Sequence, residues 1–166
     1  MRKYLLIIIL LSLVFGSCIK DQCAYSDVAT TATSNEIAYM QSYFTSNGIT
    51  NVVQHSSGLF YTLNNPGTGA TASLCNTIVV DYAATRLGYG NSFDSYTDPA
   101  GIPFVLGTLI LGVKKLTPLV KEGGQITMYI SPSMAYGNEA QRDQAGNVIL
   151  PANSYIKFDM SLISVR

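Results

Sequence analysis

Hydrophobic and polar residues alternate along three stretches of the chain, at residues 77–85, 125–130 and 155–165. In the last stretch Ile156, Phe158 and Met160 fall on one face, because successive side chains of a strand point to opposite sides. Lys157 and Asp159 fall on the other face. Shorter apolar runs at residues 52–53 and 59–63 are typical of two further strands. The pattern predicts an antiparallel sheet with one apolar face that another element must cover.

One amphipathic helix is predicted before the strands. Thr33 and Glu36 have the spacing of a capping box, in which the threonine caps the first turn and the glutamate reaches back to it. Apolar residues then recur at helical spacing, at Ile37, Met40 and Phe44. Gly48 supplies a stop. These signals predict a helix from about residue 34 to residue 46.

A second, shorter helix is predicted between residues 107 and 121, with Lys114 and Lys115 among apolar residues and an end near Pro118. One helix laid across the apolar face of an antiparallel sheet is an economical α+β architecture. The chain shows no internal repeat, and its 166 residues suggest one domain with an extension. The sequence therefore predicts the α+β fold class.

The N-terminus has the organisation of a secretory signal. Arg2 and Lys3 give it a positive start. The apolar run at residues 4–15 is shorter than the about 20 residues that span a bilayer. It ends in Gly16-Ser17-Cys18, which is similar to the lipobox where bacterial lipoproteins are cleaved and acylated on the cysteine.

Two interpretations of this ending are open: an ordinary signal cleaved near Ser17, or a lipoprotein acylated on Cys18. Phe15 departs from the usual leucine of a lipobox, but the small-small-Cys ending favours the lipoprotein. Residues 1–17 are then a signal peptide, and the small, polar residues 18–32 a lipid-anchored tether. Ile19 is not the aspartate that retains enterobacterial lipoproteins, which favours the outer membrane of a bacterial cell envelope.

Composition argues against several classes of function. Charged residues make up 12% of the chain, with 10 basic and 10 acidic residues, so we expect no nucleic-acid partner. His55 is the only histidine and no Cys/His cluster occurs, so we expect neither a metal site nor a cofactor. We interpret His55 as a surface residue. Cys23 and Cys75 remain once Cys18 is acylated, and an oxidising envelope favours a disulfide between them over two free thiols.

Short motifs occur in a fixed order from Leu59 to the C-terminus. They are Val80-Asp81-Tyr82, Phe93-Asp94-Ser95, Phe104-Val105-Leu106-Gly107, Ile110-Leu111-Gly112, Glu122-Gly123-Gly124, Ala135-Tyr136-Gly137, Val148-Ile149-Leu150-Pro151 and Phe158-Asp159. This order and spacing resemble the FKBP-type peptidyl-prolyl isomerases. The resemblance implies an antiparallel half-barrel of five or six strands wrapped on one short helix. It assigns residues 59–166 to the isomerase domain and residues 33–58 to an N-terminal helix and extension.

The resemblance also implies a hydrophobic cleft that binds Xaa-Pro segments. Its catalytic residues would be Tyr82, Asp94, Tyr136 and Phe158. Its substrate-binding residues would be Phe93, Ile102, Leu109, Ile110, Val113, Ile149 and Leu150. Taken singly, Asp94 could instead cap the turn at Ser95, and Tyr136 could be an ordinary loop residue.

The function implied is isomerisation of Xaa-Pro bonds in exported proteins, by a monomer whose partners are proline-containing polypeptides and, through the lipid anchor, the membrane. Val113 replaces the tryptophan usual at the pocket floor, and no arginine lies between Asp94 and Phe104. These departures argue against tight macrolide binding. Isomerisation stays the leading interpretation, and the departures support its alternative, a non-catalytic binding module in an envelope or surface complex. An unrelated β-rich lipoprotein, such as a glycan binder, is disfavoured by the motif order.

Overall fold

The computed structural model describes residues 23–166, so the predicted signal peptide and Cys18 lie outside the described residues. Over this described range the chain forms two α-helices, nine strands and three 3₁₀ turns, and the predicted α+β class is confirmed. In order these are α1 (Ser34–Ser46), β1 (Val53–Gln54), β2 (Phe60–Asn65), β3 (Thr77–Arg86), β4 (Ser92–Tyr96), β5 (Ile102–Val105), η1 (Leu106–Thr108), α2 (Leu111–Leu116), η2 (Thr117–Leu119), β6 (Gly124–Ile130), η3 (Pro132–Met134), β7 (Gln141–Arg142), β8 (Val148–Leu150) and β9 (Ile156–Val165).

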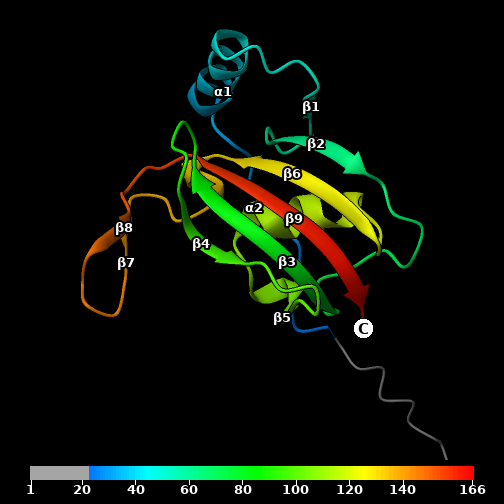
Figure 1. Cartoon of the computed structure of the whole chain (residues 1–166). Coiled ribbons are helices and arrows are strands. Elements are labelled where there is room, and N and C mark those ends of the chain that lie inside the picture. The colour runs from blue at the N-terminus through cyan, green and yellow to red at the C-terminus, as the bar shows by residue number, and fades with distance from the viewer. Residues whose placement is uncertain (1–22) are drawn as a thin grey trace, which may run out of the picture.

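The main sheet is antiparallel, with strand order β1-β2-β6-β9-β3-β4 and with β5 also paired to β3 (Figure 1). It has seven strands, against the five or six implied by the family resemblance. The larger number arises because β5 pairs with residues 77–80 of β3 and β4 with residues 82–85, so two short strands share one long partner. β7 and β8 form a separate hairpin that projects from one side of the molecule (Figure 1).

The alternation of polar and apolar residues predicted β3, β6 and β9 but neither β4 nor β5. The β4 sequence is polar and largely exposed, which gives no apolar face to recognise. β5 contains Pro103, a residue that sheets tolerate on edge strands. Both strands are therefore held by their pairing with β3 and not by a pattern of their own.

Helix α1 confirms the predicted capping box and both predicted ends. The Glu36 backbone N–H donates to the Thr33 hydroxyl oxygen at 3.3 Å, and the Thr33 backbone N–H donates to Oε2 of Glu36 at 2.8 Å. After Ser46, Gly48 adopts a positive φ of 64°, where a side chain would be strained. The local sequence alone therefore fixes the extent of this helix.

The main core lies between the sheet and α2 (Figure 1). Val113 and Leu116 of the helix are buried together with apolar residues of the sheet, among them Ile126, Met128 and Leu162. Gly112 permits this close approach, because a Cβ at that position would overlap the side chain of Ile130. The single apolar face predicted from the alternation is the face that α2 covers.

Helix α1 covers part of the opposite face of the sheet. The ring of Phe44 packs edge-on against the rings of Phe60 and Tyr129, with centroid distances of 5.2 and 4.9 Å. By the alternation of β6, Tyr129 falls on the face away from the core residues Ile126 and Met128, yet only 5% of its surface is exposed. It is buried because α1 docks there, which strand alternation does not reveal.

Residues 23–32, which we call the N-terminal strap, lie against the body of the domain. Cys23 and Cys75 form a disulfide with their Cα atoms 5.5 Å apart. The ring of Tyr25 rests on Gly107, where any side chain would overlap it. Ala32 is buried, and its N–H donates to the Ser57 carbonyl at 2.8 Å. The described part of the predicted tether is therefore attached to the domain at several points.

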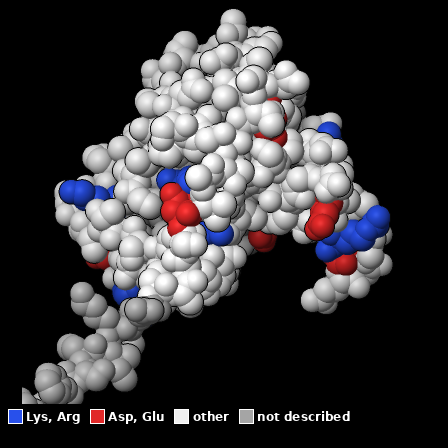
Figure 2. Space-filling model, turned by 180° about the vertical axis from the view of Figure 1, so that it is seen from behind, with Lys and Arg blue, Asp and Glu red and all other residues white. Residues whose placement is uncertain are grey.

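Charged side chains occur in small groups of both signs on the rear face, with uncharged surface between them (Figure 2). This distribution follows from the low content of charged residues, 12% of the chain. Among residues 23–166, neither helix is long and apolar enough to cross a bilayer.

Candidate functional site

A small apolar cavity of about 120 Å³ lies between α2 and the inner face of the sheet. Strands β3 and β9 supply one wall, and α2 with the segment just before it supplies the opposite wall. Seven of the residues that the sequence places at the site line this cavity: Tyr82, Asp94, Leu109, Ile110, Val113, Tyr136 and Phe158. The structure thus brings together residues that are spread over 77 positions of the chain, between Tyr82 and Phe158.

Three further residues line the cavity without having been predicted there: Val80, Phe104 and Met160. Val80 and Met160 lie two positions from Tyr82 and Phe158 on the same strands, so strand alternation places each pair on one face. That alternation was the signal that could have identified them. Phe104 belongs to a quoted motif and contacts the ring of Tyr82 edge-on at 6.1 Å.

Four predicted substrate-binding residues do not line this cavity. Phe93 and Ile149 border a neighbouring groove of about 310 Å³. The register of β4 against β3 shifts at Phe93, between the pairs Ala84–Asp94 and Thr85–Ser92. Ile102 packs against the main core, opposite Val80 in the sheet. Leu150 is 1% exposed and is part of the core. Contact of these four residues with a substrate stays a prediction.

The aromatic walls of the cavity are fixed by strand register. Ala84 of β3 pairs with Phe158 of β9, and Tyr82 pairs with Met160. Tyr82 and Phe158 are therefore diagonal neighbours on one face, where long side chains reach each other. Their rings are stacked with centroids 5.2 Å apart and planes 8° apart. The stack presents flat apolar surface to whatever enters the cavity.

Among residues 23–166, Asp94 is the only carboxylate in the cavity wall. The Tyr82 hydroxyl donates to its Oδ2 at 3.0 Å, which orients the carboxylate at the edge of the aromatic stack. Within the described residues, the hydrogen bonds of Asp94 do not include a cap on Ser95. Burial raises the pKa of Tyr82 to about 12, with further contributions from the hydrogen bond and charge of Asp94 and from Tyr136. Tyr82 is thus a protonated donor to Asp94 at neutral pH.

Tyr136 approaches the cavity from the loop that follows β6. Burial raises the pKa of its hydroxyl, and the nearby charge of Asp94 raises it further. Tyr136 is half-buried and keeps its proton at neutral pH. The cavity therefore combines apolar walls, one oriented carboxylate and one tyrosine hydroxyl able to donate a hydrogen bond.

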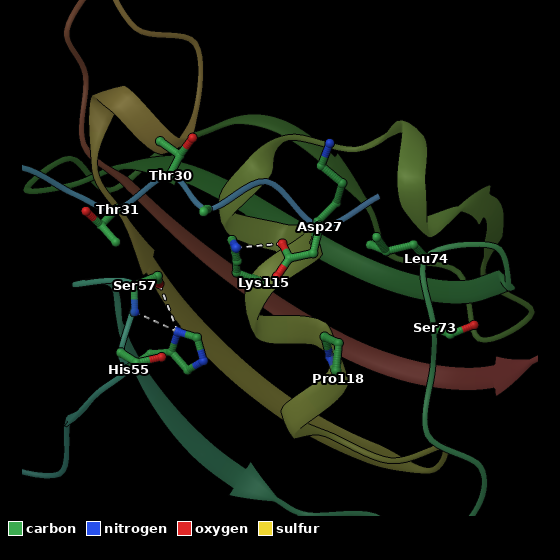
Figure 3. A pocket seen from close by; sticks show the side chains of 12 residues that line it. Asp27, Thr30, Thr31, His55, Ser57, Ser73, Leu74, Lys115 and Pro118 are labelled. Carbon is green, nitrogen blue, oxygen red and sulfur yellow. Dashed lines mark hydrogen bonds and ion pairs between the residues drawn. The ribbon is translucent and has the colours of Figure 1, made fainter. Parts of the chain in front are cut away.

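A second, larger cavity of about 600 Å³ lies on the other side of α2, between the helix and the N-terminal strap (Figure 3). Most of its lining residues are of polar or charged types, and Lys115 there forms an ion pair with Asp27 and donates to the Val28 carbonyl at 2.6 Å. His55, predicted as a surface residue, is half-buried in this wall. Its Nδ1 lies 2.8 Å from the Ser57 hydroxyl and accepts the Ser57 N–H at 3.2 Å, so the ring holds the turn before β2.

Residues 69–163 match the family model of the FKBP-type peptidyl-prolyl cis-trans isomerases. The match includes every residue of the small cavity and leaves α1 outside it. The chain belongs to this family. The apolar cavity between α2 and the sheet is accordingly the candidate active site of an FKBP-type domain.

Individual relatives agree with this assignment. Escherichia coli FkpA, named an FKBP-type peptidyl-prolyl cis-trans isomerase, is 35% identical over 112 residues, which are 67% of this chain and 39% of that protein. A probable FKBP-type isomerase of Haemophilus influenzae is 33% identical over 111 residues, 66% of this chain and 44% of that protein. The chain thus spans well under half of these relatives' length.

Solved structures show the same fold. The crystal structure of FkpA from Escherichia coli superposes with a TM-score of 0.65 at 30% identity and covers 80% of this chain and 60% of that one. A Pseudomonas syringae peptidyl-prolyl isomerase gives the same TM-score at 21% identity, covering 83% of this chain and 98% of that one. At that identity the second structure supports the FKBP-type fold alone.

Proposed function

We propose that this FKBP-type domain is a peptidyl-prolyl cis-trans isomerase that acts on Xaa-Pro bonds of exported polypeptides. The observation that carries the proposal is the apolar cavity of about 120 Å³ with the stacked rings of Tyr82 and Phe158 and the single oriented carboxylate of Asp94. The family assignment supports it, because residues 69–163 match FKBP-type isomerases.

The chemistry requires neither a nucleophile nor a cofactor. Rotation about a peptide bond crosses a barrier of about 18–20 kcal/mol that arises from amide resonance. Around proline the two isomers are close in energy, but uncatalysed exchange takes roughly 10–100 s. Resonance places charge on the carbonyl oxygen, and water stabilises this charge in the planar state. An apolar cavity removes that stabilisation from the planar amide. The rotated amide loses less solvation energy, because its charge separation is smaller. The cavity therefore favours the rotated transition state over the planar ground state.

Each residue of the cavity has a role in this scheme. The stacked rings of Tyr82 and Phe158 form one flat apolar wall for the proline ring, and Val113, 2% exposed, forms the floor. The hydroxyl of Tyr136 donates to a carbonyl of the substrate. Asp94, oriented by Tyr82, faces the carbon of the rotating amide. The small volume of the cavity suits one proline side chain. Sites for drug-sized ligands typically have volumes of about 300–1,000 Å³, so we do not expect tight macrolide binding.

The Asp94→Asn variant tests this assignment. Hydrogen bonds to charged groups contribute about 1.5–3 kcal/mol, so we expect kcat/KM for an Xaa-Pro peptide to fall by roughly 10- to 100-fold in a protease-coupled assay. The pKa of Tyr82 should also fall from about 12, because the charge of Asp94 helps to raise it. Ultraviolet difference spectroscopy at high pH measures that change.

Asp81→Asn is the matched control for Asp94→Asn. Asp81 precedes Tyr82 on β3, and it borders a different groove on the other side of the sheet. Its replacement should leave both kcat/KM and the ionisation of Tyr82 unchanged. If Asp94→Asn retains the kcat/KM of the Asp81→Asn control, Asp94 has no part in the reaction.

The alternative function is a non-catalytic binding module that holds a proline-containing loop of a partner. One observation favours it: the floor of the cavity is Val113, where the family usually has a tryptophan. A single experiment on the unaltered domain distinguishes the two functions. A module would bind a proline peptide, with shifts of the Tyr82 and Phe158 resonances, and would show no turnover.

The cell envelope is the proposed location, with residues 1–17 as signal peptide and Cys18 as the lipid-anchored residue, on the outer membrane. The disulfide between Cys23 and Cys75 supports an oxidising compartment. In this proposal residues 33–58 extend a monomeric isomerase domain of residues 59–166. Labelling of cells with a tagged fatty acid tests the anchor: the wild-type chain should carry label, and label retained by Cys18→Ser would refute it.

A further inference from the structure

Glu36 of helix α1 contacts the loop after β6, which carries Tyr136 into the cavity. Its Oε1 accepts the backbone N–H of Ser133 at 2.8 Å, and its Oε2 accepts the hydroxyl of Ser133 at 2.7 Å. The same Oε2 accepts the N–H and the hydroxyl of Thr33 at 2.8 and 2.9 Å. One carboxylate therefore joins the first turn of α1 to a residue 97 positions away in the chain.

Ser133 lies three residues before Tyr136 in a compact turn. The N–H groups of Ala135 and Gly137 both donate to the Pro132 carbonyl, at 3.0 and 2.8 Å. Met134, between Ser133 and Ala135, is fully buried in the main core. Met134 thus holds the turn on the side that faces the core, and Glu36 holds it on the side that faces α1. Tyr136 follows directly from this turn.

Helix α1 is anchored to the domain by residues that follow Glu36. Phe44 packs against Phe60 and Tyr129 on the face of the sheet opposite α2. The ring of Tyr39 stacks on that of Tyr155, with centroids 4.2 Å apart. The helix lies above the end of the sheet, outside the curve that holds α2 (Figure 1). Because α1 is anchored to the sheet independently of the loop, it can act as a fixed support for Ser133.

We infer that Glu36 is a positioning residue for Tyr136, so that α1 completes the prolyl cavity from outside the region that matches the family. The inference rests on the proposed function for its effect on catalysis, and on the Glu36–Ser133 contacts for its structural part. Partial burial raises the pKa of Glu36, but the hydrogen bonds from Ser133 and Thr33 outweigh it and hold the pKa below the usual value. The carboxylate is therefore charged at neutral pH, which strengthens the hydrogen bonds that it accepts.

Three variants separate positioning of Tyr136 from capping of the helix. Glu36→Ala removes the contacts to Ser133 and to Thr33. Thr33→Ala removes the cap hydroxyl and leaves both contacts to Ser133, so it is the matched control. Glu36→Gln is the conservative variant, because its carbonyl can still accept the Ser133 N–H and its amide can donate to the Ser133 hydroxyl.

In the isomerase assay we expect Glu36→Ala to lower kcat/KM on the order of 10-fold, since misplacement of a group that contacts substrate is costly. Glu36→Gln should recover most of this loss, and Thr33→Ala should stay within about twofold of wild type, at temperatures where all are folded. In a Tyr136→Phe background Glu36→Ala should have little further effect, because the hydroxyl that it positions is absent. Full additivity of Glu36→Ala and Tyr136→Phe would overturn the inference.

A readout independent of activity keeps the two proposals distinguishable. In a chain with isotope-labelled tyrosine, Glu36→Ala should shift the ring resonances of Tyr136, whereas Thr33→Ala should not. If the wild-type domain lacks isomerase activity but these shifts occur, the proposed function fails and the positioning stands. If Glu36→Ala leaves the Tyr136 resonances unchanged, the positioning is refuted whatever the activity.

Discussion

Replacement of Phe158 with alanine is expected to lower kcat/KM for an Xaa-Pro peptide by roughly 10- to 100-fold. Phe158 supplies half of the stacked aromatic wall, with its ring 5.2 Å from that of Tyr82. Loss of the apolar surface of one large side chain costs about 1.5–3 kcal/mol, which is the size of this change. Tyr82 would lose its stacking partner as well, and water could enter beside the amide. The protease-coupled isomerase assay at several peptide concentrations gives the change.

Leu162→Ala on the same strand is the control for Phe158→Ala. Leu162 is 1% exposed and faces the core without lining the cavity, so its truncation should cost about 2–5 kcal/mol of unfolding free energy. Below its melting temperature the Leu162→Ala variant should retain the wild-type kcat/KM. Equal losses of activity in the two variants would show that general destabilisation, and not the cavity wall, explains Phe158→Ala.

The second large effect concerns stability. The disulfide between Cys23 and Cys75 closes a loop with a sequence separation of 52 residues. By the chain-entropy relation a disulfide that closes such a loop stabilises the fold by about 4 kcal/mol. The Cys23→Ser/Cys75→Ser double variant should therefore lose up to this much of the free energy of unfolding. In thermal unfolding this corresponds to a decrease of about 8–16 °C in Tm.

Reduction provides the internal control for the disulfide. Dithiothreitol should lower the Tm of the wild-type domain toward that of the Cys23→Ser/Cys75→Ser variant and should have no effect on the double variant itself. A wild-type Tm that does not respond to the reductant would mean that the two cysteines are not paired.

Features set by neighbouring residues could be predicted from the sequence. The capping box of Thr33 and Glu36 and the stop at Gly48 depend only on contacts within one helix, and both ends of α1 were confirmed. Strands β3, β6 and β9 alternate clearly because one of their faces is the core. β4 could not be found in this way, because its residues are polar and its pairing partner β3 alone holds it in the sheet.

The candidate site was predicted through the family resemblance more than through the pattern of residues. The resemblance placed Tyr82, Asp94, Tyr136 and Phe158 together, and these four line one cavity. It did not reveal the role of Glu36, since a contact between residues 97 positions apart leaves no trace in either local sequence. The burial of Tyr129 was missed for a similar reason, because it depends on where α1 docks.

The most direct measurement of the central claim follows cis-trans exchange of a proline peptide by NMR in the presence of the unaltered domain. We expect catalytic amounts of the domain to speed the exchange of the peptide far beyond the uncatalysed roughly 10–100 s. The peptide should at the same time shift the resonances of Tyr82, Val113 and Phe158, and a peptide with alanine in place of proline should not. Unchanged exchange, or shifts confined to residues outside the cavity, would contradict the account.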